Sequence, residues 1–369
     1  MRNAKCIAFF VVEDKLNIPE NKLEDRLSEI RSLINTLGWK AYEVASIKVK
    51  RLDPAFYITR GKVEYIKLLP YLSEVDYIIF YNDLSPVHIR NLENELGRKV
   101  LTKVDLVLMI FKEHAVSMEA KLQVELASLM VELPRLYGIG KGMEQIKGGI
   151  GLRGPGERRT EVMKRHIKEK IRVLKSRIEE IKKHRRNQLK LRRGIFNISI
   201  VGYTNSGKST LMNYLTKAGV LEEDKLFSTL DTKTKKLYID GFIMTITDTV
   251  GFIEDVPPQL VEAFYSTLEV VKVSDLLLHV VDINSDFIDD KIASVNNILK
   301  TIFKTDGTEV PESLYVFNKI DLLKDVGVIR ELEEKYPNSV FISAKEGINI
   351  RGLRRRLVEI VGSISKCRV

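Results

Sequence analysis

The segment Gly202-Tyr203-Thr204-Asn205-Ser206-Gly207-Lys208-Ser209 limits the fold more than any other feature of the chain. It has the form G-x-x-x-x-G-K-S, follows a strand-like apolar run at 196–201, and precedes an amphipathic helix through Leu211 and Leu215. In this context the glycines let backbone N–H groups close around a β-phosphate, Lys208 neutralises the β and γ oxygens, and Ser209 offers its hydroxyl to Mg²⁺. The segment therefore predicts a phosphate-binding loop between a strand and a helix.

A second motif supplies metal and γ-phosphate contacts. Asp248-Thr249-Val250-Gly251 follows the strand predicted at 243–247. Asp248 can hold Mg²⁺ through water, and the Gly251 amide can contact the γ-phosphate. We therefore expect Asp248 and Ser209 to share the metal, and we assign Lys208 and Gly251 to the reaction itself.

Two later motifs point to guanine. Asn318-Lys319-Ile320-Asp321 ends the strand predicted at 314–317, and Ser343-Ala344-Lys345 follows the last predicted strand. The Asp321 carboxylate can accept from both N1–H and N2–H of guanine, a donor pair that adenine lacks. Lys319 would lie along the purine plane, Asn318 would brace the loops, and the Ser343 segment would aim a backbone amide at guanine O6. Because the four motifs occur in this order, the chain predicts GTP as the nucleotide and GDP as the product.

The strand pattern of this region predicts the sheet. Apolar strands are expected at 196–201, 237–239, 243–247, 276–281, 314–317 and 340–342. Asp240-Gly241 between the second and third predicts a type I′ hairpin, which makes that pair antiparallel. We therefore expect a doubly wound α/β sheet of the P-loop GTPase kind with one reversed edge strand, in a domain covering residues 194–369.

The switch region and the hydrolysis step are less specific in sequence. Phe227-Ser228-Thr229-Leu230-Asp231 is the best candidate for the switch, and we assign Thr229 to Mg²⁺ and to γ-phosphate sensing; Ser228, Thr232 and Thr234 are the other hydroxyls nearby. Phe252 stands directly after Gly251 and cannot orient water by hydrogen bonding, so unassisted hydrolysis should be slow. Asn205 could support K⁺ near the phosphates or could stabilise its own turn, and both interpretations stay open.

The residues before the GTPase region form two further sections. Residues 1–112 alternate strand-like runs, such as 7–12 and 77–81, with helical periodicity at 21–37 and 85–96, which predicts a small α/β domain with parallel strands. Residues 113–193 show two heptad stripes joined by a glycine-rich loop at 138–156. We expect an antiparallel coiled-coil hairpin, with the first helix ending at Pro134.

Charge is concentrated on the second helix of this hairpin. Residues 157–193 carry 16 Lys or Arg against 5 Glu, a local charge of +11, whereas the other 332 residues sum to −1. A long basic helix is suited to phosphate backbones, so structured RNA read by shape is the expected partner; a solvated coiled-coil face is the alternative. We expect no DNA sequence specificity.

Composition excludes several other classes of protein. No apolar run reaches the roughly 18 to 20 residues of a membrane span, and the N-terminal run of seven residues is too short for a signal peptide. The two cysteines, Cys6 and Cys367, lack metal-ligand spacing, and the five histidines do not cluster. A monomeric cytoplasmic protein without a zinc site or a histidine base is therefore expected.

The motifs together resemble the HflX family of ribosome-associated GTPases. The resemblance rests on the phosphate loop continued by Thr210, on the segments around Thr229 and Phe252, and on N-terminal stretches that extend it over nearly the whole chain. These stretches are Leu84-Ser85-Pro86, Arg90-Asn91-Leu92-Glu93, Lys121-Leu122-Gln123-Val124-Glu125-Leu126-Ala127, Leu133-Pro134-Arg135-Leu136 and Gly154-Pro155-Gly156-Glu157.

Membership of this family implies binding to the large ribosomal subunit and, in bacterial relatives, splitting of stalled ribosomes. This chain departs from the family at Arg158-Arg159-Thr160-Glu161, where Thr-Gln-Leu-Glu is usual, which would alter a ribosomal contact. Its Lys and Ile content would fit an archaeal or thermophilic source. Two alternatives remain: an RNA-remodelling module that the GTPase domain only regulates, and ATP use by residues 1–112, where Arg60-Gly61-Lys62 is too short for a phosphate loop.

Overall fold

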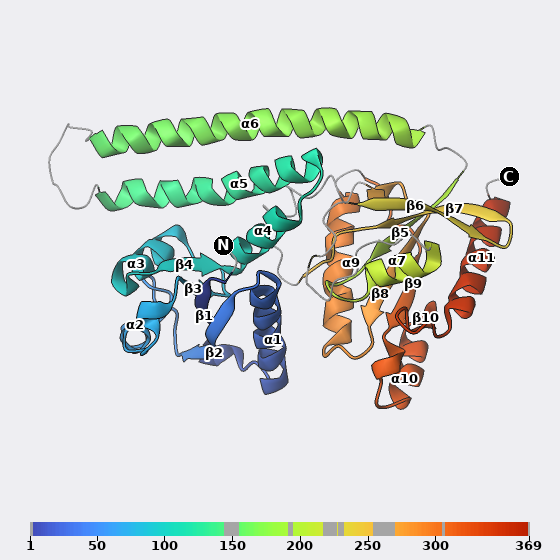
Figure 1. The fold of residues 1–369 in the computed structure, drawn as a ribbon, viewed down its shortest axis with the longest axis horizontal. Helices are drawn as coiled ribbons and strands as arrows, with labels where there is room; N and C mark the ends of the chain where they lie inside the picture. The colour runs from blue at the N-terminus through green and yellow to red at the C-terminus, as the bar shows by residue number, and fades with distance from the viewer. Residues whose placement is uncertain are drawn as a thin grey trace. The chain divides into compact units, whose positions relative to one another are not determined.

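The computed structural model describes residues 3–143, 155–190, 195–216, 227, 232–253, 270–304 and 307–367. These residues belong to two compact units (Figure 1). The first contains the described residues of Met1–Glu113 and Lys121–Glu180, and the second contains those of His114–Ala120, Ile181–Val256 and Phe264–Val369. Among the described residues, no helix is both long enough and apolar enough to cross a bilayer.

The first unit is built on a parallel sheet of four strands in the order β2-β1-β3-β4. The strands are β1 (Lys5–Glu13), β2 (Lys40–Val49), β3 (Tyr77–Phe80) and β4 (Lys99–Thr102), and the helices are α1 (Glu20–Thr36), α2 (Arg60–Lys67), α3 (Pro86–Leu96) and α4 (Lys103–His114). The predicted parallel α/β domain is confirmed. Strand β2 was not predicted, because its side chains are mostly half-exposed and show no clean alternation.

Two long helices follow, and most of their residues belong to this unit. They are α5 (Met118–Met143) and α6 (Pro155–Lys190), and they lie side by side (Figure 1). The heptad stripe of α6 is buried at Ile167, Leu174 and Ile178. At 1.5 Å per residue, the 36 residues of α6 extend over roughly 54 Å. The predicted helical hairpin is therefore confirmed.

The predicted end of the first helix at Pro134 is wrong, because α5 continues through Pro134 to Met143. A proline inside a helix removes one backbone hydrogen bond, but tertiary contacts can offset that loss. Here the next residue, Arg135, forms an ion pair with Asp105 over 2.8 Å, and Leu136 is buried. The glycine-rich loop is accordingly shorter than 138–156, since 138–143 and 155–156 are helical; residues 144–154 lie outside the described residues.

The second unit contains a six-stranded sheet in the order β10-β9-β8-β5-β7-β6. The strands are β5 (Phe196–Val201), β6 (Lys233–Ile239), β7 (Phe242–Asp248), β8 (Leu276–Asp282), β9 (Ser313–Asn318) and β10 (Ser339–Phe341). Only β6, at the edge, runs antiparallel to its neighbour β7. Asp240 and Gly241 join them with φ of 45° and 85°, as a type I′ turn requires. The predicted doubly wound sheet with one reversed edge strand is confirmed.

Helices cover both faces of this sheet in the second unit. They are α7 (Lys208–Thr216), α9 (Ile288–Lys304), α10 (Gly327–Lys335) and α11 (Ile350–Cys367). One apolar cluster joins α7 and α11 to the sheet through residues such as Leu211, Ile246 and Leu357, and a second joins α9 through Val295 and Leu299. Because β5, β7, β8, β9 and β10 are parallel, their carboxyl ends meet at one edge of the sheet, where the sequence motifs lie.

Candidate nucleotide site

The phosphate loop connects β5 to α7 at this carboxyl edge. Three of its residues adopt positive φ: Gly202 at 150°, Asn205 at 59° and Gly207 at 92°. A Cβ at Gly207 would collide with the side-chain amide of Asn318, which comes from the end of β9. Glycine is therefore required here because the loop is packed directly against the guanine motif, and α7 begins immediately after it with Lys208.

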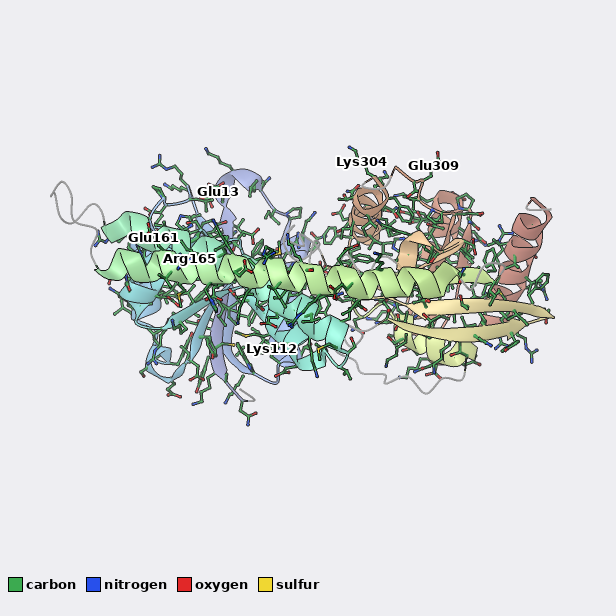
Figure 2. The ribbon with its side chains drawn as sticks, turned by 90° about the horizontal axis from the view of Figure 1, so that it is seen from above. Glu13, Lys112, Glu161, Arg165, Lys304 and Glu309 are labelled. Carbon is green, nitrogen blue, oxygen red and sulfur yellow. The ribbon has the colours of Figure 1, made fainter. Side chains whose placement is uncertain are left out.

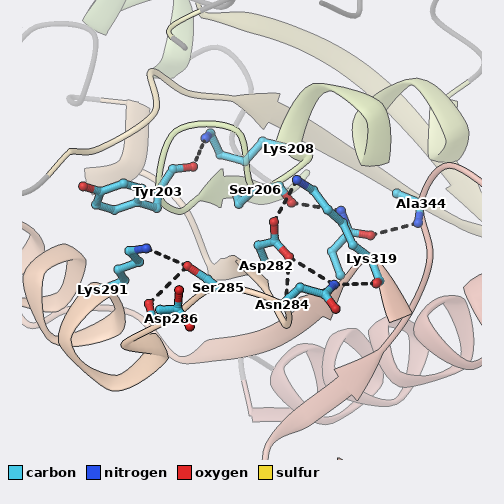
Figure 3. Close-up of polar contacts among 11 residues, drawn as sticks. Tyr203, Ser206, Lys208, Asp282, Asn284, Ser285, Asp286, Lys291, Lys319 and Ala344 are labelled. Carbon is cyan, nitrogen blue, oxygen red and sulfur yellow. Dashed lines mark hydrogen bonds and ion pairs between the residues drawn. The ribbon is translucent and has the colours of Figure 1, made fainter. Parts of the chain in front are cut away.

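Lys208 is almost completely buried beneath this loop. Its ammonium donates to the carbonyl oxygen of Tyr203 over 2.8 Å (Figure 3). Burial lowers the pKa of Lys208 to about 8, the Asp248 carboxylate acts in the opposite direction, and the positive charge of Lys319 lowers it further. Among the residues that the structure describes, this ammonium hydrogen-bonds a neutral carbonyl, and a buried ammonium in such a place is suited to bind an anion such as a nucleotide phosphate.

The two predicted metal ligands lie next to each other. The Ser209 hydroxyl, at the start of α7, donates to Asp248 Oδ2 over 2.6 Å, and Asp248, at the end of β7, is fully buried. A hydroxyl and a carboxylate are the hard oxygen donors that Mg²⁺ accepts, and Mg²⁺ is usually held by one or two such groups plus substrate phosphates. The residues present therefore fit Mg²⁺.

The strand-end residues after Asp248 are bonded to the phosphate loop. Thr204 donates its amide to the carbonyl oxygen of Phe252 over 2.7 Å, and the Thr249 hydroxyl donates to the carbonyl oxygen of Ile200 over 2.7 Å. Val250 and Gly251 are buried between these anchors. The Phe252 side chain, only 5% exposed, packs into the apolar cluster under α9.

The proposed switch falls mostly outside the described residues. Ser228, Thr229, Leu230 and Asp231 are among those outside, so the assignment of Thr229 stays a prediction. Phe227 is described: it is buried, has φ of 58°, and its carbonyl oxygen lies 2.7 Å from His114 Nδ1. Of the other hydroxyls considered, Thr234 lies on β6 and hydrogen-bonds Thr247.

Asn318 joins three parts of the site. Its side-chain amide donates to the carbonyl oxygen of Ser206 over 2.9 Å, and its side-chain oxygen accepts from the amide of Ala344 over 2.9 Å. Ser343, on the same segment, is fully buried, whereas Lys345 is exposed. This single side chain thus connects the phosphate loop with the two predicted base loops.

The exposed carboxylate of Asp321 follows Lys319 in a short 3₁₀ turn at Ile320–Leu322. Lys319 itself is in the left-handed region, with φ of 68°. Its ammonium forms an ion pair with Asp282 over 2.8 Å, and its carbonyl oxygen accepts from the Asn284 side-chain amide over 2.9 Å (Figure 3). Neither Asp282 nor Asn284 was predicted from the sequence. The available signal was that Asp282 ends a buried strand at the same edge as Asn318.

One histidine lies close to the site. His279 on β8 is 1% exposed, and burial together with the charge of Lys208 lowers its pKa to about 3. It is therefore neutral at physiological pH and packs beside Tyr315 at 5.3 Å between ring centroids.

The carboxyl edge of the sheet carries groups that can bind a phosphate chain at one end and a planar base at the other. Lys208, Ser209 and Asp248 stand at one end, and Asn318, Lys319 and Asp321 stand at the other. Grouping a buried cation with hard oxygen ligands favours phosphoryl transfer from a metal-bound nucleotide.

Three family models match consecutive parts of the chain. The model described as "GTP-binding GTPase N-terminal" matches residues 24–112, and "GTP-binding GTPase Middle Region" matches residues 114–192. The model described as "50S ribosome-binding GTPase" matches residues 197–319.

Curated relatives from bacteria and archaea are similar over most of the chain. GTPase HflX of Caldanaerobacter subterraneus is 42% identical over 95% of this chain and 79% of its own. GTPase HflX of Escherichia coli K12 is 38% identical over 92% and 80%, and that of Methanocaldococcus jannaschii is 35% identical over 85% and 78%. Among solved structures, the SsGBP complex with GDP is 29% identical, covers 98% of this chain and 99% of its own, and superposes with a TM-score of 0.51.

Proposed function

Because the chain belongs to the HflX family of GTPases, we propose that it binds GTP with Mg²⁺ at the carboxyl edge of its six-stranded sheet and hydrolyses it to GDP and phosphate. The observation that carries this proposal is the connection of phosphate loop and base loops through Asn318, next to the buried Lys208. The GDP bound in the structure of SsGBP supports the same nucleotide class.

The residues of the phosphate loop divide the work of binding. Backbone amides of Gly202–Ser209 and the Lys208 ammonium would hold the β and γ phosphates, and the Gly251 amide would donate to the γ-phosphate. Ser209, Asp248 and Thr229 would hold Mg²⁺, which would neutralise charge on the phosphate oxygens. Asn205, with φ of 59°, is the residue that would support K⁺, and comparing GTP turnover in KCl and NaCl tests this.

Replacement of Lys208 tests the phosphate assignment. Lys208→Ala should abolish GTP binding, because it removes the one buried cation in the described part of the site. Lys300→Ala is the matched control, since Lys300 is exposed on α9 in the same unit. Equilibrium binding of a fluorescent GTP analogue reads out both variants, and near-normal affinity of Lys208→Ala would overturn the phosphate assignment.

Hydrolysis by the isolated protein should be slow. The group that follows Gly251 is an apolar ring buried in the cluster under α9, so it cannot orient an attacking water. A partner or a rearranged switch would have to supply this function. A match to a family model described as a 50S ribosome-binding GTPase supports the large ribosomal subunit as that partner.

The basic helix α6 is the proposed RNA contact. Between residues 161 and 183 of α6, exposed Lys and Arg side chains recur, and Arg165, labelled in Figure 2 with Glu161, is one of them. Phosphate contacts release counterions, so binding should weaken steeply with salt. We propose that structured ribosomal RNA in the cytoplasm is bound by shape, and that a role in splitting or rescuing ribosomes follows from this binding.

Charge removal on α6 tests the RNA contact. The variant Arg165→Gln/Lys168→Gln/Arg172→Gln should weaken co-sedimentation with large subunits and lower the salt slope by about 0.7 to 0.9 for each phosphate that is no longer neutralised. Lys300→Gln/Lys324→Gln/Arg330→Gln removes the same charge from exposed positions of the second unit. An equal decrease in both variants would show a general charge effect and refute the assignment to α6.

Measurements of GTP turnover distinguish a ribosome-activated GTPase from an RNA-binding module, and ATP binding tests the third hypothesis. A ribosome-activated GTPase should hydrolyse GTP faster with purified large subunits, whereas an RNA-binding module that the GTPase domain only regulates should show no stimulation at saturating subunit. Labelled ATP binding to Lys208→Ala, whose GTP site is disabled, tests separate ATP use by residues 1–112.

A further inference from the structure

A short loop after β8 lies directly against the guanine motif. Asp282 is the last residue of β8 and pairs in register with Asn318, the last residue of β9. Because the two strands are parallel and adjacent, their next residues leave the sheet at the same edge. The register therefore brings the Asp282 carboxylate within reach of Lys319.

Two side chains of this loop hold Lys319 at two points. Asp282 Oδ2 lies 2.8 Å from the Lys319 ammonium, and the Asn284 side-chain amide donates to the Lys319 carbonyl oxygen over 2.9 Å (Figure 3). The loop is itself closed, because the backbone N–H of Asn284 donates to Asp282 Oδ1 over 3.0 Å. Ile283 adds a backbone hydrogen bond to the Asn318 carbonyl oxygen over 3.0 Å.

Lys319 needs such support for two physical reasons. Its backbone is left-handed, with φ of 68° and ψ of 36°, a conformation that is unfavourable for a residue other than glycine. Its side chain also has four rotatable bonds, and ordering them costs conformational entropy. If Lys319 is already ordered before the nucleotide binds, the free energy of ordering it is part of folding and does not reduce the affinity for the base.

We propose that Asp282 and Asn284 are positioning residues for the purine, which act by holding Lys319 extended across the base pocket before the nucleotide binds. This proposal rests on the assignment of Asn318–Asp321 to the base. The methylene stem of Lys319 would cover one face of the purine, while its ammonium stays bonded to Asp282.

Contact with a ring face does not depend on the groups at the edge of the ring. Removing the ion pair with Asp282 should therefore weaken guanine and hypoxanthine nucleotides equally, although hypoxanthine lacks the 2-amino group. Distortion of Asp321 would instead reduce the difference between the two bases, because Asp321 is the group expected to accept from N2–H.

The size of the effect follows from the exposure of the pair. The side chains of Lys319 and Asp282 are 25% and 26% exposed, so their ion pair is partly screened by water. Such pairs contribute little in absolute terms, and the expected decrease in affinity for GDP is about two- to fivefold.

The central experiment uses the full chain with Asp282→Asn, which keeps the shape of the side chain and an oxygen for the Asn284 backbone N–H. Titration calorimetry with GDP and with inosine diphosphate should show the same fold decrease for both, while the single-turnover rate at saturating GTP stays unchanged. Asp286→Asn, an exposed carboxylate four residues later, is the matched control and should bind normally. An unchanged affinity, or a decrease for GDP alone, overturns the proposal.

A double substitution shows whether Asp282 acts through Lys319. Lys319→Met keeps the stem and removes the charge, so adding Asp282→Asn to it should cause no further decrease in affinity. Additive decreases would mean that Asp282 acts elsewhere and would refute the mechanism. Asn284→Ala provides a second route, because it removes the bond to the Lys319 carbonyl oxygen without changing charge.

Failure of this proposal can be told apart from failure of the base-site assignment. If Asp321→Asn leaves the preference for guanine intact, the base site itself is wrongly assigned. If Asp321→Asn relaxes that preference while Asp282→Asn binds normally, only the positioning role is refuted.

Discussion

The amide of Phe252 donates to the carbonyl oxygen of Gly202 over 3.1 Å, which joins the residue after the metal motif to the first residue of the phosphate loop. With its backbone held there, the Phe252 ring lies among apolar residues of β5, β8 and α9. The position that follows Gly251 is therefore used for packing.

This packing predicts that a glutamine cannot take over at Phe252. Phe252→Gln should destabilise the protein by about 2 to 4 kcal/mol, because it buries an amide among apolar groups, and it should not speed hydrolysis. Phe252→Leu, the apolar control, should lose less stability than Phe252→Gln and should hydrolyse GTP at the same rate as the parent protein. Urea unfolding and single-turnover hydrolysis measure both variants; a tenfold faster Phe252→Gln would contradict the prediction.

Gly251 has no room for a methyl group. A Cβ there would lie 2.8 Å from Thr204 Cγ2, 2.9 Å from Thr204 Cα and 3.0 Å from Lys208 Nζ. Gly251→Ala should displace the amide that we propose donates to the γ-phosphate, and it should slow hydrolysis by roughly 100-fold with GDP binding retained. The control is Gly362→Ala on α11, where a Cβ meets nothing within 4 Å. Single-turnover rates of the two variants should differ clearly, and equal rates would argue against a role for this amide.

The affinity for GDP should fall as pH rises above about 8. Burial lowers the pKa of Lys208 to about 8 in the ligand-free protein, and bound phosphates would raise it again by favouring the charged form. Below pH 8 Lys208 is already charged, whereas above it binding must take up a proton, so Kd rises by up to about tenfold per pH unit.

Calorimetry in two buffers of different ionisation enthalpy, from about pH 7 to 9, would measure this proton uptake. Lys208→Arg is the control, because an arginine stays charged throughout this range while every other titrating group is kept. If the parent protein takes up no proton on binding GDP, the prediction is wrong. If Lys208→Arg takes up as much as the parent protein, the proton binds to a group other than Lys208.

His279 should make the second unit less stable in acid. Burial, and then the charge of Lys208, lower its folded pKa to about 3, so between about pH 6.5 and 3 only the unfolded chain binds this proton. Stability is therefore lost as pH falls through this window, by up to about 1.4 kcal/mol per pH unit. His279→Leu should flatten the dependence. Scanning calorimetry can follow the unfolding of the second unit, which is recognised because GDP raises its midpoint temperature. If the stability of His279→Leu changes with pH in the same way as that of the parent protein, His279 is not the cause.

Asp321→Asn should weaken GDP binding by about 10- to 100-fold, because it removes the charged group to which we assign the two guanine N–H donors. Affinity for xanthosine diphosphate should rise, since the new amide can donate to the carbonyl at C2 of xanthine. Glu346→Gln, an exposed carboxylate in the neighbouring loop, serves as the control. Competition binding with GDP, XDP and ADP measures the preference, and unchanged discrimination would count against Asp321.

Much of this architecture could be predicted from local pattern. The phosphate loop, the type I′ turn at Asp240-Gly241 and the strands β5, β7 and β8 each have a signature within a few residues, because backbone conformation and side-chain alternation act over that distance. The helical hairpin followed in the same way from its heptad stripes. Local pattern failed at Pro134, where the pairing of Arg135 with Asp105, thirty residues earlier, accompanies a continued helix.

The sequence alone thus determined which chemical groups are present and in what order: a cation and a hydroxyl after the glycines, then the carboxylate of Asp248, then the Asn318–Asp321 motif. Only the tertiary structure decided which groups meet. Asp282 bonds Lys319, Asn318 bonds Ser206, and Phe252 packs into the apolar cluster under α9. These pairs are set by which strands are neighbours in the sheet and by their register, and neither is encoded in residue spacing along the chain.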